Sequence, residues 1–303
     1  MNKLSTLTLI ASLITASVLS ATNFVSITDL GSSARSIALG NVDGYSNSAD
    51  AVFSNPAALT NVHGLSVSLF SATLMNEVTY FNAALSAKTT HGTIAVGIYE
   101  QSVSNIASTD ISGSYNKAIQ TGSYDFKNSV VKLSYQEDLS AKLSVAASYS
   151  LYTQSVAAYS ATGSNIDAGI LASFNRFKLS VYAQNILLNQ TVNFSHNAAE
   201  TLPFAISTTA IVPFKSFVFI PQLKITRGQT LLSTGLSFTP GFLPSLTVNA
   251  GYNEKLDYIA QKHANLTLGA SLSLLQLDLH VAYERSEHIE MDHNMYASFS
   301  YSL

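Results

Sequence analysis

The last nine residues of the chain alternate strictly between two kinds of side chain. Tyr296 and three serines occupy one set of positions, and the other set is apolar: Met295, Ala297, Phe299, Tyr301 and Leu303. Successive side chains of a β-strand point to opposite faces of a sheet. This period of two therefore predicts a terminal strand with one apolar face.

The same period recurs along most of the chain, which predicts an all-β fold. Pro221 is the least certain position in a paired strand, because proline has no N–H to donate, so the strand count could change by two. We count fourteen segments: 65–69, 79–85, 94–98, 129–135, 143–151, 166–174, 177–183, 204–212, 217–225, 232–238, 246–252, 266–274, 277–283 and 295–303.

The composition favours a membrane environment for these strands. Charged residues make up 11% of the chain, against about 25% in a soluble domain, whereas hydrophobic residues at 47% are near the soluble average. A transmembrane barrel explains both values, since lipid-facing positions exclude charge while the lumen accepts Ser, Thr, Asn and Gly. We therefore predict a closed antiparallel β-barrel of about 14 strands over residues 63–303.

The N-terminus predicts export from the cytoplasm. A short basic start, Met1-Asn2-Lys3, precedes an uncharged apolar stretch over 4–19 and the small residues Ser20 and Ala21. This order is typical of a secretory signal peptide, which we assign to residues 1–21. The alternative, a membrane anchor, needs a longer apolar stretch of about 20 residues.

The C-terminal ending resembles the closing strand of bacterial outer-membrane barrels. That resemblance implies that Phe299, Tyr301 and Leu303 form the assembly signal, that the barrel-assembly machinery and outer-membrane lipids are partners, and that the protein lies in the outer membrane.

Residues 22–62 do not alternate, and we predict that they form a plug. Ala34–Gly40 and Ser48–Phe53 are typical of short helical or irregular pieces, and Pro56 argues against a central strand. A segment of this kind before a barrel can occupy its lumen.

If the apolar face of each strand contacts lipid, several charged side chains point into the lumen. Two interpretations stay open: a polar conduit or binding cavity, or groups that only pair with one another as packing. The charged residues expected to line the lumen are Lys132, Lys142, Asp167, Lys178, Lys224, Asp278, His280 and Glu284.

Several motifs together resemble the FadL-like outer-membrane barrels, most closely the PorV/PorQ branch. They are Gly31–Gly40, the Asn55-Pro56-Ala57 box, Gly163–Gly169 with Asp167, Gln184-Asn185 and Leu202-Pro203. The resemblance implies a fourteen-stranded barrel whose plug carries the Asn-Pro-Ala box.

The same resemblance implies two functions. The first is a channel for hydrophobic or amphipathic small molecules. The second is a docking or shuttle component of type IX secretion, with secreted proteins as partners. A structural outer-membrane protein is the remaining alternative.

The sequence offers no enzymatic or cofactor motif. Cysteine is absent, and no nucleophile elbow, Walker loop or HExxH helix occurs. His288, Glu290, Asp292 and His293 lack fixed ligand spacing, so we predict no metal site, no cofactor and no catalysis. A net charge of −3 with scattered signs predicts no nucleic-acid partner.

Residues 101–127 are polar and rich in Ser, Thr and Gly. Because outer-membrane barrels place their longer loops outside the cell, we expect an extracellular loop that covers the mouth or admits a solute.

Overall fold

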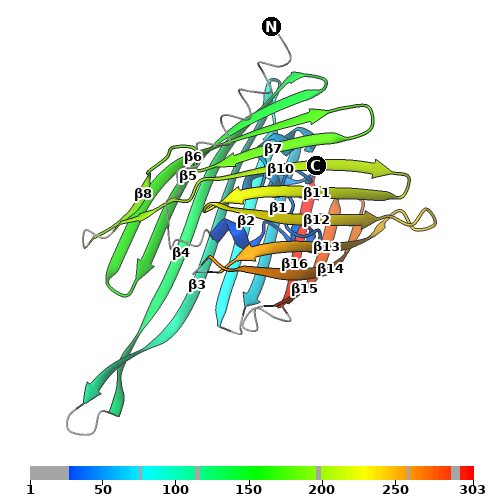
Figure 1. Ribbon diagram of the computed structural model, residues 1–303. Coiled ribbons are helices and arrows are strands. Elements are labelled where there is room, and N and C mark those ends of the chain that lie inside the picture. Colours follow the sequence, from blue (N-terminus) through cyan, green and yellow to red (C-terminus); the bar gives the residue numbers. More distant parts are fainter. Residues whose placement is uncertain (1–26, 75–76, 113–116, 196–198, 258–259, 288–293) are drawn as a thin grey trace.

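The computed structural model describes residues 27–74, 77–112, 117–195, 199–257, 260–287 and 294–303 (Figure 1). The predicted signal peptide and the residues 288–293 lie outside these ranges. The N-terminal helices are η1 (Ile27–Leu30), α2 (Ala34–Ala38), η2 (Ala49–Phe53) and η3 (Pro56–Asn61). None of the helices in these ranges has the length and apolar content needed to cross a membrane.

The strands of the described ranges are β1 (Leu65–Leu74), β2 (Val78–Lys88), β3 (Gly92–Ser112), β4 (Lys117–Ser140), β5 (Leu143–Val156), β6 (Tyr159–Ser173), β7 (Lys178–Gln184), β8 (Thr191–Phe194), β9 (Ala199–Thr201), β10 (Ala205–Phe214), β11 (Phe217–Thr226), β12 (Gln229–Phe238), β13 (Leu246–Leu256), β14 (Lys262–Leu274), β15 (Leu277–Ser286) and β16 (Asn294–Ser302).

The strands close into a barrel. Each strand pairs antiparallel with its neighbours, β1 pairs with β16, and β5 pairs with β6 to complete the ring. Of the sixteen strands in the described ranges, β8 and β9 attach to the rim of β6, so fourteen form the closed wall. These fourteen are the fourteen predicted segments, so the predicted fold class is confirmed.

The alternation of side chains separates an apolar outside from a packed inside. Outward residues such as Leu133 and Leu268 expose 56% and 59% of their surface, although they are fully apolar. Inward residues such as Ser66, Ser150 and Thr209 are buried. Burial of the polar face and exposure of the apolar face is the pattern of a barrel surrounded by lipid.

The two ends of the barrel differ. One end, here called the turn end, contains tight connections such as 141–142, 215–216 and 275–276 together with the C-terminal Leu303. The opposite end, here called the loop end, contains the 185–204 connection, which carries β8 and β9.

Residues 101–112 and 117–127 form strands where a loop was predicted, and the extracellular placement stays a prediction. Strands β3 and β4 stay paired from Ile106 and Tyr124 up to Ser112 and Lys117, and this hairpin projects far beyond the other strands (Figure 1). Polar residues with little apolar alternation therefore continue the two strands, because the ladder below them fixes the backbone pairing.

Pro221 lies inside β11 and does not change the strand count. It pairs with Thr234 of β12. On its other side, the register of β10 and β11 skips residues 210–211 and 220–221. The missing N–H of proline accounts for this interruption.

The N-terminal segment lies inside the ring of strands, as Figure 1 shows in blue. Its side chains Ala34, Ile37, Leu39, Val52 and Leu59 are almost completely buried. The ring of Phe53 packs on Tyr99 of β3, with ring centroids 4.1 Å apart. The apolar core of this protein is therefore the contact between plug and wall, as expected for a plugged barrel.

Candidate functional site

The plug is attached to the wall by Asn55 of the Asn-Pro-Ala box. Its side-chain oxygen accepts from the backbone N–H of Ala57 at 2.9 Å and caps η3, while Pro56 occupies the first helical position. The side-chain nitrogen lies 3.0 Å from the carbonyl oxygen of Ile170, 2.8 Å from Ser180 Oγ and 3.1 Å from the carbonyl oxygen of Val181. Since Ile170 and Val181 are register partners, one side chain bridges β6 and β7.

Gly169 makes room for this attachment. A Cβ atom at this position would lie 1.9 Å from Asn55 Oδ1. The second glycine of the Gly163–Gly169 motif is therefore explained by the close approach of the box.

A second contact joins the plug to β10 and β11 through residues 41–45, here called the gate segment. The backbone N–H of Asp43 donates to Gln222 Oε1 at 2.7 Å, and Ser207 Oγ donates to Asp43 Oδ2 at 2.7 Å. Gly44 has φ +82°, and a Cβ there would lie 2.1 Å from Ser180 Oγ. Glycine thus allows the gate segment to lie directly against the wall.

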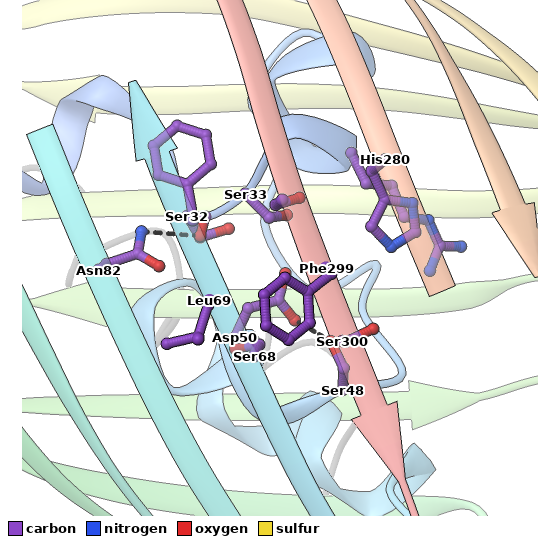
Figure 2. A pocket seen from close by; sticks show the side chains of 13 residues that line it. Ser32, Ser33, Ser48, Asp50, Ser68, Leu69, Asn82, His280, Phe299 and Ser300 are labelled. Atoms are coloured by element: carbon purple, nitrogen blue, oxygen red, sulfur yellow. Dashed lines mark hydrogen bonds between the residues drawn. The ribbon is translucent and has the colours of Figure 1, made fainter. Parts of the chain in front are cut away.

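The opposite side of the plug is also attached to the wall by hydrogen bonds. Asn82 of β2 donates to the carbonyl of Ser32 at 2.9 Å, and the backbone N–H of Ala34 donates to Ser298 Oγ of β16 at 3.0 Å. Figure 2 shows Asn82 of β2 bonded to Ser32, and His280 of β15 on the other side of β1 and β16. Three buried atoms here have no partner among the described residues: Ser68 Oγ, Asn82 Oδ1 and His280 Nδ1.

Two larger cavities lie on the two sides of the gate segment. The loop-end cavity has a volume of about 220 Å³ and includes Asn41, Lys224 and Asn253 in its lining. The turn-end cavity has a volume of about 410 Å³ and includes Gly44, Tyr45 and Ile211. The gate segment therefore lines the loop-end cavity with its first residue and the turn-end cavity with its last two.

A buried ionic cluster fixes the wall beside the plug. Lys132 Nζ lies 2.7 Å from Asp167 Oδ2, and both side chains are fully buried. Tyr182 Oη lies 3.0 Å from the same Lys132 nitrogen, and the backbone N–H of Asn185 donates to Asp167 Oδ1 at 2.9 Å. Asn185 Nδ2 donates in turn to the carbonyl of Pro203 at 2.9 Å.

This cluster brings together three motifs of the sequence: Asp167 of Gly163–Gly169, Asn185 of Gln184-Asn185, and Pro203 of Leu202-Pro203. They lie where β7 ends and the 185–204 connection departs. Their arrangement favours the packing interpretation for Lys132 and Asp167, because each buried charge already has its partners.

The other predicted lumen residues have separate environments. Lys178 donates to Asn61 of the plug at 3.3 Å, and Lys224 lies 2.6 Å from Asp29. Glu284 lies 2.5 Å from Lys255 Nζ and also accepts from Tyr296. Asp278 is half-buried close to the turn end of β15.

The prediction that Lys142 lines the lumen is wrong. It is exposed in the tight turn between β4 and β5 and lines none of the cavities described above. Lys142 lies one residue before β5 begins at Leu143, in the turn where the backbone reverses, so the alternation of the strand does not include it.

The residues of the predicted assembly signal, Phe299, Tyr301 and Leu303, lie on the outward face of β16 and are exposed. The predicted plug motif Asn55, Pro56 and Ala57 is buried. Among the described residues no group of three or more His, Asp and Glu side chains could hold a metal ion, and 288–293 lie outside those residues.

Sequence reasoning missed Asp43 and Asp29, since neither belongs to an alternating strand. A partial signal existed for Asp43, because Gly44 follows it and marks a sharp bend in a segment otherwise free of glycine between Gly40 and Gly64.

No family model matches the sequence, and no curated protein matches it either. Solved structures do match. The Pseudomonas putida toluene transporter TodX has 14% identity and a TM-score of 0.63, covering 90% of this chain and 98% of its own. The CymD monoaromatic hydrocarbon channel has 13% identity and a TM-score of 0.66, covering 90% and 98%.

A Pseudomonas aeruginosa FadL homologue has 11% identity and a TM-score of 0.59, covering 89% of this chain and 98% of its own. The chain thus has the fold of the FadL-type channels, which confirms that resemblance for the fold. The narrower likeness to the PorV/PorQ branch stays a prediction.

Proposed function

We propose that this chain is an outer-membrane channel that passes hydrophobic or amphipathic small molecules and that its plug controls the passage. The observation that carries the proposal is the pair of cavities separated by the gate segment. A barrel built only for structural support has no need of space on both sides of a plug.

The turn end would face the periplasm, because bacterial outer-membrane barrels place short turns there. A solute would enter at the loop-end cavity, pass between the gate segment and strands β10–β11, and leave from the turn-end cavity. The contacts that must yield are the hydrogen bonds of Asp43 with Gln222 and Ser207 and the apolar cluster that Val42 shares with Ile211 and Ile220.

The chemistry of the solute follows from the similar structures only by analogy of fold. TodX and CymD are named for toluene and monoaromatic hydrocarbons.

The proposed function includes no catalytic step. Outer-membrane lipids and the assembly machinery are the partners expected for any such barrel, and the outward Phe299 and Tyr301 support that expectation.

The test is uptake of a hydrophobic dye by whole cells. The outer membrane excludes N-phenyl-1-naphthylamine, which fluoresces once it reaches an apolar phase. Cells expressing the chain should take up the dye faster than cells with an empty vector, and deletion of residues 22–62 should accelerate uptake further. Uptake of a hydrophilic dye by the intact chain at vector level is the control for general leakage. Dye uptake equal to the vector for both forms would remove the proposal.

A further inference from the structure

The turn end of the barrel is apolar on one side of the ring. The hairpins β6–β7, β10–β11, β12–β13 and β14–β15 are neighbours there, because β7 pairs with β10, β11 with β12, and β13 with β14. Their turns carry large apolar side chains that are exposed. These residues, here called the apolar rim, are Phe174, Phe214, Phe217, Phe242, Leu274 and Leu275.

The turns on the other side of the ring are polar. The connection between β2 and β3 is Thr89-Thr90-His91, and all three residues are exposed. The stretch before β5 contains Glu137, Asp138 and Lys142, and its exposed Leu139 stands alone between Asp138 and Ser140. The two sides of the turn end therefore differ in the surroundings that suit them.

The apolar rim is directed away from the protein. Phe242 exposes 90% of its surface and Phe214 68%, and Leu275 is fully exposed. Phe242 belongs to the 239–245 connection, which projects beyond the end of β12 (Figure 1). Exposed apolar side chains that adjoin one another mark a contact surface, because their transfer out of water is favourable.

The apolar rim continues the outward face of the wall. Phe217 and Phe238 are register partners whose rings are stacked, with centroids 4.6 Å apart, and the next outward pair is Phe219 and Leu236. Neither 217–219 nor 268–275 contains a charged residue. On this side the surface that suits lipid thus runs from the wall into the turns without a charged boundary.

Two basic residues stand among the rings of the apolar rim. The turn at 174–177 reads Phe-Asn-Arg-Phe and the turn at 214–217 reads Phe-Lys-Ser-Phe, so each places one cation between two phenylalanines. In the described part of the chain, neither Arg176 nor Lys215 forms an ion pair within 4.0 Å. The segments 174–177, 214–217, 239–245 and 274–277 contain no acidic residue. Aromatic rings beside long basic side chains are typical of the boundary between hydrocarbon and head groups.

A lipid leaflet suits this surface better than a protein partner does. The apolar rim extends along an arc of four hairpins, and a bilayer presents a continuous surface to such an arc. A protein interface instead concentrates its anchoring residues near the centre of one patch.

We propose that the apolar rim is immersed in the lipid leaflet on the turn-end side of the membrane, with Arg176 and Lys215 at the phosphate groups. The polar turns after β2 and β4 stay in water, so the barrel is seated deeper on the side of β10–β15. The inference goes beyond the proposed function and does not depend on it, since depth in the membrane is measured without a solute.

The experiment uses tryptophan as a reporter of depth, because the chain contains none. F214W, F242W and L275W place a single indole in the apolar rim, and T90W and K142W place it in the polar turns. Each full chain is folded into phosphatidylcholine vesicles, and gel mobility with and without heating shows whether the barrel is folded. Lipid brominated near the head of its acyl chains quenches an immersed indole, whereas acrylamide quenches an indole in water.

We expect brominated lipid to quench the three reporters of the apolar rim about twofold more than T90W and K142W, because an indole at the hydrocarbon boundary is shielded from water. Acrylamide should quench them less by a similar factor. The three rim variants are independent of one another, so a single variant that fails to fold leaves the comparison intact.

Two results would overturn the proposal. Equal quenching of all five reporters by brominated lipid would exclude an unequal depth of the two sides. Quenching of F214W, F242W and L275W by acrylamide as strong as that of T90W would place the apolar rim in water, where a protein partner could reach it. Neither result alters the expectation for dye uptake, so the failure of this proposal is distinguishable from the failure of the proposed function.

Discussion

The side-chain amide of Asn55 in the plug donates to the hydroxyl of Ser180 in β7, 2.8 Å away. The same nitrogen also lies within hydrogen-bond distance of the Ile170 and Val181 carbonyl oxygens. One residue of the Asn-Pro-Ala box thus joins the plug to two neighbouring strands of the wall, beside the gate segment.

Replacing Asn55 should loosen the plug. N55A removes the buried donor to Ser180 Oγ and to the carbonyl oxygens of Ile170 and Val181, which costs about 1–3 kcal/mol. Hydrogen exchange of the backbone amides over residues 49–61 should accelerate accordingly. N175A, in an exposed turn, is the matched control and should exchange as the parent does. Unchanged protection in N55A would show that packing alone holds the plug.

Gly169 should be coupled to Asn55. In G169A the new methyl group would lie 1.9 Å from Asn55 Oδ1, so the amide must leave its position. We expect G169A to accelerate exchange as N55A does, and the double variant to add little, because both changes break the same contact. G241A, where nothing lies within 4 Å of the new atom, should leave the hydrogen exchange of the plug unchanged. Additive effects would contradict the coupling.

Breaking the buried pair of Lys132 and Asp167 should strongly destabilise the barrel. K132M leaves the Asp167 carboxylate buried without its cation, at a cost of about 3–5 kcal/mol. Urea titration of folding into lipid vesicles measures the change. K142M removes an exposed lysine and should change the free energy of unfolding little. A loss for K132M equal to that for K142M would argue against the ionic cluster.

Acidification should favour the closed gate. Removal of Asp43 from water raises its pKa above the ordinary 3.8, and this outweighs the opposing attraction of Lys224. The packed plug therefore binds the proton more tightly than the displaced plug, and it gains stability as pH falls from neutral towards 3.8. Potassium conductance in planar bilayers should fall over this range, and D43N should abolish the dependence. A conductance that rises on acidification would contradict this assignment.

The strands were predictable because lipid imposes a period of two on them. Leu268 and Leu133 had to be apolar, so each marked its strand in the sequence. Where lipid is absent this signal disappears. The loop-end parts of β3 and β4 and the short β8 and β9 lack this alternation, and their polar residues concealed their pairing.

The site was less predictable than the fold. The Asn55 box and Asp167 stood out by resemblance, but the contacts that explain them depend on residues distant in the sequence, such as Ser180 and Asn185. Lys142 shows the limit of the alternation, since the period alone does not indicate where a strand turns. The apolar rim comes from four hairpins that are separate in the sequence, and no local pattern connects their turns.

The central claim is that a solute must displace the gate segment to cross the barrel. Ser207 Oγ and Asp43 Oδ2 are 2.7 Å apart, and the chain has no cysteine, so D43C/S207C introduces the only pair able to form a disulfide. S134C/S148C, whose parent hydroxyls are 2.6 Å apart within the wall, is the matched control.

The deciding measurement is dye uptake by cells that carry each oxidised variant, before and after reduction with dithiothreitol. The account predicts that oxidised D43C/S207C blocks uptake of N-phenyl-1-naphthylamine, that reduction restores it, and that the control is unaffected in both states. Uptake at the parent rate through fully cross-linked D43C/S207C would contradict the account.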